Sequence, residues 1–99
     1  MYKTKFTEAA ALEIEKASLW YSEQQDDLDK RFDKNISDAL EKLQSDKIIY
    51  GPVYRGLSRI FIKKFPYQIY FKKDAARKLI IIFGVLHSKQ NRSILDKRI

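Results

Sequence analysis

The chain has 99 residues, no cysteine and a formal net charge of +7 at pH 7. Its length and a hydrophobic content of 44% predict one compact domain, residues 1–99, with a small core. The lack of cysteine excludes disulfides and a cysteine-ligated zinc site, and we expect no metal or other cofactor. The longest apolar run, Leu79–Phe83, is too short to span a bilayer, so we expect a cytoplasmic protein with no membrane partner.

Positive charge is concentrated in the second half of the chain. Residues 1–47 contain eight Lys/Arg and eleven Asp/Glu and carry −3, whereas residues 48–99 contain twelve Lys/Arg and two Asp/Glu and carry +10. Such an asymmetry favours a polyanionic or acidic partner. The alternative is a solvated basic surface without a partner. We favour the first interpretation because the excess is confined to one half of the chain.

The first predicted elements are a short strand and an amphipathic helix. Residues 2–6 alternate in a strand pattern, and Thr7 can cap the helix that follows. The helix has one narrow apolar face, formed by Ala10, Ile14, Ala17 and Tyr21. Leu12 and Leu19 lie on its opposite side, with Trp20 between the two faces. These three residues are either single exposed apolar side chains or part of a surface that binds a partner.

A second helix follows after a short polar connection. Residues 23–27 interrupt the apolar pattern and provide a cap for the second helix. Its apolar stripe runs over four turns and consists of Leu28, Phe32, Ile36, Ala39 and Leu43. The short connection predicts an antiparallel helical hairpin. We expect this hairpin to bury five side chains against a sheet, namely Ile14, Leu28, Phe32, Ile36 and Leu43.

The region Arg59–His87 reads as three consecutive β-strands. Pro66 belongs at a strand start or on an edge, and Leu79–Phe83 is apolar at every position, which predicts a central strand buried on both faces. In the tail after His87, we expect Ile94, Leu95 and Ile99 to form either one helical turn or a docking strand. The predicted fold class is α+β, in the order β-α-α-β-β-β, with an N-terminal helical hairpin packed on one face of a small, mostly antiparallel sheet.

Two stretches of the sheet region carry a resemblance to a known family. They read R-x3-K-K-F-P-Y-x-I-x-F and V-L-H-x-K-x-N-R, and the matching residues are Arg59, Lys63, Lys64, Phe65, Pro66, Tyr67, Ile69, His87, Lys89, Asn91 and Arg92. With this order of elements, nearly the whole chain resembles the RelE/ParE superfamily of type II toxins. The resemblance implies a growth-inhibiting toxin whose constitutive partner is a cognate antitoxin.

The superfamily that the chain resembles holds two activities. RelE-like members are ribosome-dependent mRNA endoribonucleases that need no metal, and ParE-like members act on DNA gyrase. In the nuclease branch an arginine follows the tyrosine at the strand entry, and a tyrosine or histidine closes the tail. Here Gln68 follows Tyr67, and the tail has neither residue beyond His87. We therefore favour a ParE-like toxin of the plasmid stabilisation type, with the mRNA endoribonuclease as the alternative, and enzymatic activity stays open.

The candidate catalytic residues are His87, Arg59 and Tyr67, each with a structural alternative. A histidine with an ordinary pKa of about 6.5 suits acid–base chemistry, but this one ends a predicted buried strand. The arginine either clamps an anion or bridges an acidic group of the helices, and the tyrosine is either a stacking platform or a core aromatic. The residues expected to contact the target or a nucleic acid are Arg59, Lys63, Lys64, Lys89 and Arg92.

A central strand that is apolar on both faces needs two covers, and the helical hairpin supplies only one. We therefore expect an acidic segment of the antitoxin to cover the second face and to pair with Arg92, Lys97 or Arg98. Leu12, Leu19 and Trp20 are further candidates for antitoxin contact. Without antitoxin the exposed patch predicts self-association. A third class, a non-toxic nucleic-acid-binding domain, is compatible with the basic half alone.

Overall fold

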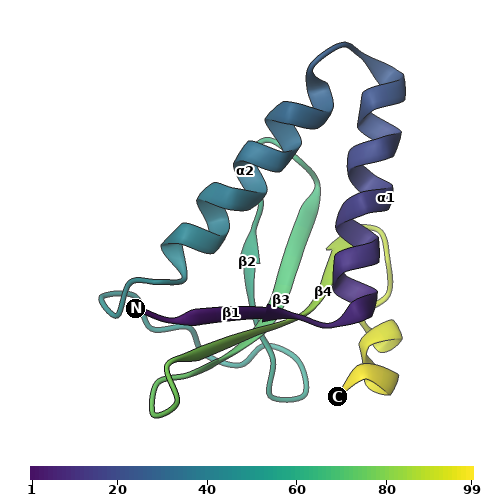
Figure 1. Cartoon of the computed structure of the whole chain (residues 1–99). Coiled ribbons are helices and arrows are strands. Elements are labelled where there is room, and N and C mark those ends of the chain that lie inside the picture. Colours follow the sequence, from purple (N-terminus) through teal and green to yellow (C-terminus); the bar gives the residue numbers. More distant parts are fainter.

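The computed structural model describes all 99 residues (Figure 1). In chain order the elements are β1 (Lys3–Phe6), α1 (Glu8–Gln24), α2 (Leu28–Lys42), β2 (Ser58–Phe61), β3 (Tyr67–Asp74), β4 (Leu79–His87) and the 3-10 helix η1 (Arg92–Arg98). The strands form one sheet in the order β1-β4-β3-β2. β1 runs parallel to β4, and the other two pairings are antiparallel. The predicted α+β fold class and element order are confirmed, and η1 adds a third helical element.

The two helices begin in different ways. The prediction for α1 is confirmed, because Thr7 Oγ1 accepts a hydrogen bond from the Ala10 N–H at 3.2 Å. The predicted side-chain cap of α2 was wrong. Asp27, the residue before α2, has a left-handed backbone with φ of 65°, and its side chain makes no capping hydrogen bond. The tight reversal between the helices requires this conformation, and the Asp27 carboxylate pairs with Lys30 instead.

The main core lies between the helical hairpin and one face of the sheet. Its buried members are Tyr2, Ala10, Ala17, Tyr21, Phe32, Ile36, Ala39, Leu43, Ile62, Ile69, Phe71, Ile80, Ile82 and Val85. Phe32 and Leu43 are fully buried, as predicted, whereas Ile14 and Leu28 are half-buried at the margin. Aromatic rings pack edge-on at the centre, with ring centroids of Phe32 and Tyr67 5.3 Å apart.

β4 is an inner strand, as predicted, but its burial differs along its length. Ile80 and Ile82 are buried in the main core, while Ile81 between them is only half-buried. A bulge follows, because Phe71 pairs with Ile82 and Tyr70 pairs with Gly84. Consecutive residues of β4, which point to opposite faces of the sheet, are all buried only beyond the bulge, from Gly84 to Leu86. The expectation that residues 79–83 are buried on both faces was therefore wrong.

The second face of the sheet is covered by the chain itself. Leu95 of η1 is fully buried against Leu57, Tyr70 and Leu86 in a small second cluster. Gly84 allows this close approach, because a Cβ at that position would lie 2.7 Å from Leu95 Cδ2. The expectation of a bare second face was wrong, because a short tail can bury one leucine without forming a long element. No helix of the chain has the length and hydrophobicity needed to cross a bilayer.

Candidate functional site

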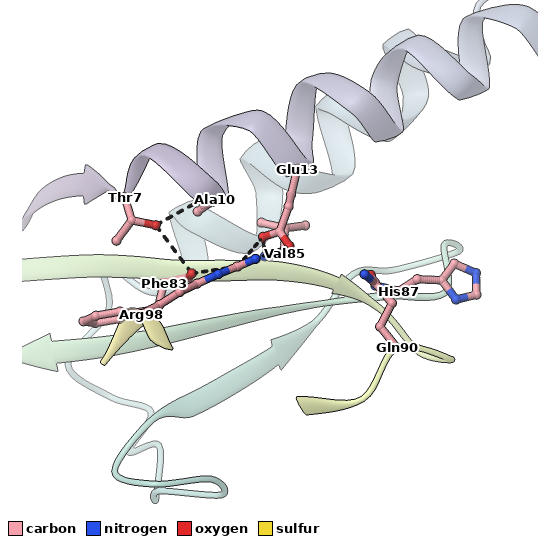
Figure 2. Close-up of polar contacts among 8 residues, drawn as sticks. All are labelled: Thr7, Ala10, Glu13, Phe83, Val85, His87, Gln90 and Arg98. Carbon is pink, nitrogen blue, oxygen red and sulfur yellow. Dashed lines mark hydrogen bonds and ion pairs between the residues drawn. The ribbon is translucent and has the colours of Figure 1, made fainter. Parts of the chain in front are cut away.

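A network of side chains closes the edge of β4 where β1 ends (Figure 2). β1 pairs with β4 only as far as Phe6, opposite Ile82, so the next groups on this edge of β4 have no partner strand. The Phe83 carbonyl accepts from Thr7 Oγ1 at 3.4 Å, and the Val85 N–H donates to Glu13 Oε1 at 3.0 Å. The N terminus of α1 therefore takes over the hydrogen bonding of the edge.

Arg98 of η1 completes this network. Its guanidinium binds both carboxylate oxygens of Glu13, at 2.8 and 3.0 Å, and also donates to the Phe83 carbonyl at 3.2 Å. Both side chains of this ion pair are largely buried, with 17% and 18% of their surface exposed. Such a bidentate pair fixes the tail in position. We expected Arg98 to pair with an acidic segment of the antitoxin, but it forms an ion pair with Glu13 of the same chain.

Three of the predicted residues, Arg59, His87 and Arg92, come together at the other end of β4. They line a pocket of about 270 Å³ at the second face of the sheet. We call it the basic pocket; its lining residues are Arg59, Gln68, Tyr70, Leu86, His87, Ser88, Gln90, Asn91 and Arg92. Neither arginine forms an ion pair. The basic pocket therefore offers two uncompensated cations and several amide groups to an anion.

Aromatic rings orient both arginines of the basic pocket. The Arg59 guanidinium lies 5.0 Å from the Phe61 ring centroid, and that of Arg92 lies 5.0 Å from the Tyr54 ring centroid. Arg92 also donates to the Val53 carbonyl at 3.4 Å. The Tyr54 hydroxyl donates to Asp96 in η1 at 2.6 Å, and this hydrogen bond raises the pKa of Tyr54. Stacking restricts the guanidinium groups while leaving N–H donors for a ligand.

The His87 imidazole is held by its neighbours. Its Nδ1 accepts from the Lys89 N–H at 3.1 Å, and its ring packs edge-on to Tyr67 with centroids 5.2 Å apart. Gln90 Oε1 accepts from the His87 N–H at 2.8 Å. A neutral imidazole with an accepting Nδ1 carries its proton on Nε2. In this state neither ring nitrogen has a free lone pair, because Nδ1 is engaged by the Lys89 N–H, so the arrangement does not suit His87 to act as a general base.

Tyr67 lies on the opposite face of the sheet from Arg59. It lines a second hollow of about 580 Å³, the Trp20 groove, formed by Glu13, Lys16, Ala17, Trp20, Tyr21, Pro66, Tyr67, Val85, His87 and Gln90. Burial raises the pKa of the Tyr67 hydroxyl, which makes it a poor base near neutral pH. The three catalytic candidates are therefore divided between two surfaces, and only His87 touches both.

The apolar residues predicted on the outside of α1 are exposed but do not form one patch. Leu19 and Trp20 are 63% and 54% exposed, and Leu12 is exposed as well. Trp20 lines the Trp20 groove, whereas Leu19 lines a hollow between the two helices beside Asp29 and Asp33. The two side chains thus point to different sides of α1, and one flat partner surface would not cover both.

The remaining predicted cations lie outside the basic pocket. Lys63 lines a groove beside α2, Lys64 occupies a left-handed turn with φ of 68°, and Lys89 and Lys97 are exposed. Sequence reasoning missed Glu13, which organises the β4 edge. Its signal was present, since a carboxylate three residues after Ala10 falls near the apolar face of α1. No three metal-ligating side chains lie close enough together to hold an ion.

Comparisons with known proteins agree with this architecture. The isolated E. coli RelE toxin, solved by crystallography, superimposes with a TM-score of 0.56 at 13% sequence identity, covering 98% of this chain and 95% of that one. At this identity the likeness concerns the fold. No curated protein sequence matches the chain. Residues 4–92 match the family described as the ParE toxin of type II toxin–antitoxin system, parDE. The chain therefore belongs to the ParE toxin family of type II toxin–antitoxin systems.

Proposed function

We propose that this toxin inhibits growth by acting on DNA gyrase in the cytoplasm, as part of a plasmid-stabilising module. The basic pocket carries the proposal, because it is equipped to bind an anionic surface and poorly equipped to cleave RNA. Arg59 and Arg92 lack carboxylate partners and are oriented by stacking. Lys63, Lys64 and Lys89 lie outside the basic pocket and would contact the target more weakly.

Cleavage of RNA without a metal requires a base for the 2′-hydroxyl, cations for the phosphate and an acid for the leaving oxygen. In the basic pocket Gln68 is neutral, and it accepts the hydrogen bond of the Tyr70 hydroxyl at 2.9 Å. His87 Nδ1 is already used by the Lys89 N–H. Neither residue is therefore suited to act as the general base, which favours binding of the target over hydrolysis of RNA.

The antitoxin is the second partner of this toxin. We assign its main contact to the Trp20 groove, because an exposed tryptophan beside a half-buried tyrosine is typical of a protein-binding surface. Leu12, which is exposed on α1, would extend this contact, and Leu19 would join it only where the antitoxin also reaches the hollow between the two helices. Arg92 and Lys97 are free to pair with antitoxin carboxylates, whereas Arg98 joins only if such a carboxylate replaces Glu13.

A ribosome-dependent mRNA endoribonuclease is the second candidate function. One observation favours it, namely that Arg59, His87 and Arg92 line the same pocket. In that case the arginines stabilise the phosphate, and His87 in its imidazolium form donates a proton to the leaving oxygen and becomes neutral. The missing base then has to come from the ribosome or the RNA.

Induction of the toxin in bacterial cells separates the two functions. A gyrase poison produces double-strand breaks and an SOS response while transcripts stay intact. A nuclease produces truncated transcripts first. The purified toxin should inhibit DNA supercoiling by gyrase in vitro, and addition of the antitoxin should restore it. Transcript cleavage without any effect on supercoiling would overturn the gyrase proposal in favour of the nuclease.

A further inference from the structure

The basic pocket lacks an apolar contact of the kind found at the centre of protein interfaces. Its volume is about 270 Å³, and its two hydrophobic lining residues, Tyr70 and Leu86, are buried. A stable interface covers about 800 Å² on each partner, and its buried centre is more apolar than its rim. A protein target that binds Arg59 and Arg92 therefore needs a neighbouring apolar surface on the toxin.

Residues 48–53, in the connection from α2 to β2, expose three large apolar side chains. We call this segment the Ile49 loop. Ile49 is 93% exposed, more than any other large hydrophobic residue except Met1, and Ile48 and Val53 are 48% and 43% exposed. One exposed apolar side chain is normal on a protein surface, whereas three in one short segment indicate a binding surface.

The Ile49 loop adjoins the basic pocket. The Val53 carbonyl accepts the hydrogen bond of Arg92, and the ring of Tyr54, the next residue, stacks on the same guanidinium. Four residues of extended chain reach at most about 14 Å, so the Cα atoms of Ile49 and Val53 lie within that distance of each other. A surface of about 800 Å² is about 30 Å across, so one partner can cover the loop and the pocket together.

Contacts with the body of the domain hold the Ile49 loop in place. The ring of Tyr50 packs edge-on against Phe71 of the main core, with centroids 5.3 Å apart, and its carbonyl accepts from Ser58 Oγ at 3.3 Å. The Val53 N–H donates to the Leu57 carbonyl at 2.8 Å. A loop that is fixed before binding loses little conformational entropy when a partner covers it. The exposed isoleucine is therefore presented in a defined position.

We propose that Ile49 is the apolar anchor with which the toxin docks on the protein part of DNA gyrase, while the basic pocket binds carboxylates beside that contact; this rests on the proposed action on gyrase. Two other occupants fit the surface less well. Duplex DNA offers phosphates to Arg59 and Arg92 but leaves the isoleucine in water. A second copy of the chain, related by a two-fold axis through this surface, would bring two basic pockets together. The complementary surface on gyrase is therefore an apolar depression with carboxylates on one side.

Two matched substitutions test this anchor. Ile49→Ser removes the apolar contact, and Ile99→Ser makes the same chemical change at an exposed isoleucine of the C terminus. The probe is the gyrase holoenzyme without DNA, and calorimetry measures its affinity for each toxin. We expect Ile49→Ser to bind about tenfold more weakly than wild type, because the apolar side chain that gyrase covers is lost. Ile99→Ser should bind within about twofold of wild type. Thermal melting checks that both variants fold.

Equal affinities of Ile49→Ser and wild type for gyrase would overturn the anchor while leaving the action on gyrase intact. Binding of wild-type toxin to a short DNA duplex as tightly as to gyrase would also overturn it, because the target would then not need the apolar contact. A loss of antitoxin affinity in Ile49→Ser, without a loss of gyrase affinity, would assign the Ile49 loop to the antitoxin instead. If wild-type toxin neither binds gyrase nor inhibits supercoiling, the proposed function itself fails, and the anchor with it.

Discussion

The two faces of the sheet differ in the size of the core that covers them. On the helix face, fourteen buried residues form one continuous core with the helical hairpin. On the second face, four buried residues form a small cluster under η1, and an ion pair holds the cover in place. The basic pocket lies at the end of this weaker cover. The large core stabilises the fold, and this leaves polar groups of the second face available for a partner.

The largest expected effect is on the helix face. Phe32→Ala removes a fully buried ring that packs against three other aromatic residues. We expect a loss of about 3–5 kcal/mol in the free energy of unfolding, which is close to the whole stability of a small domain. Thermal melting measures it. A midpoint within two degrees of wild type would show that the hairpin does not form the main core.

A substitution in the core of the second face should lower the free energy of unfolding by less. Leu95→Ala empties a fully buried site, but η1 lies at the chain terminus and can partly relax into the space. We expect a loss of about 2–3 kcal/mol, at the low end for a buried leucine. Urea denaturation gives the value. An effect equal to or larger than that of Phe32→Ala would remove the contrast between the two faces.

The ion pair between α1 and η1 is the next test. Glu13→Gln keeps an acceptor for the Val85 N–H but leaves the Arg98 guanidinium without a carboxylate. We expect a loss of about 1–3 kcal/mol, less than for a fully buried pair because both side chains retain some solvent contact. Glu15→Gln, on an exposed side chain of the same helix, is the matched control and should change little. Equal effects would mean that the ion pair does not hold η1.

A hydrogen bond near the N terminus should make the stability of the fold depend on pH. The Tyr2 hydroxyl donates to Asp46 Oδ1 at 2.5 Å, and this hydrogen bond lowers the pKa of Asp46 and raises that of Tyr2. A lowered carboxyl pKa stabilises the fold above the unfolded value of 3.8, and this stabilisation is lost as the pH falls through the folded value. The raised Tyr2 pKa contributes below 10.0 and is lost at higher pH.

Tyr2→Phe should therefore lower the melting temperature at neutral pH, and the difference from wild type should shrink below pH 3.8 and well above pH 10.0. Melting curves across this range measure the difference. We expect it to be the smallest effect among these variants, because the substitution keeps the buried ring and the Asp46 carboxylate is exposed to solvent. A difference that stays constant from acid to alkaline pH would show that packing of the ring, rather than its hydroxyl, matters at this position.

Much of the fold follows from local sequence patterns. The apolar stripes identify both helices and their buried face, and β-branched runs identify the three consecutive strands. The Thr7 cap also follows from the sequence, whereas the start of α2 does not. A polar residue before a helix suggests a side-chain cap, but the tight turn gives Asp27 a left-handed backbone in which its carboxylate does not cap the first backbone N–H groups of α2. Such backbone angles depend on the geometry of both flanking helices.

The candidate site was only partly predictable. Arg59, His87 and Arg92 were chosen from the sequence, and the sheet brings them together. Tyr67 came from the same motif, yet strand alternation places it on the other face. The cover provided by η1 was missed, because Leu95 and Arg98 contact residues far away in sequence, including Glu13. Long-range pairs of this kind leave little trace in a single sequence.

We propose that the second face carries the toxic activity, whereas the helix face carries the stability of the fold. The most direct test compares two double variants with the same change in net charge. The first combines Arg59→Glu and Arg92→Glu in the basic pocket. The second combines Lys30→Glu and Lys47→Glu at exposed sites outside it. Growth is followed after induction at equal protein levels, and unfolding is measured in parallel. We expect the first variant to lose toxicity with a stability within about 0.5 kcal/mol of wild type, and the second to remain toxic. Equal toxicity of the two variants would contradict the account.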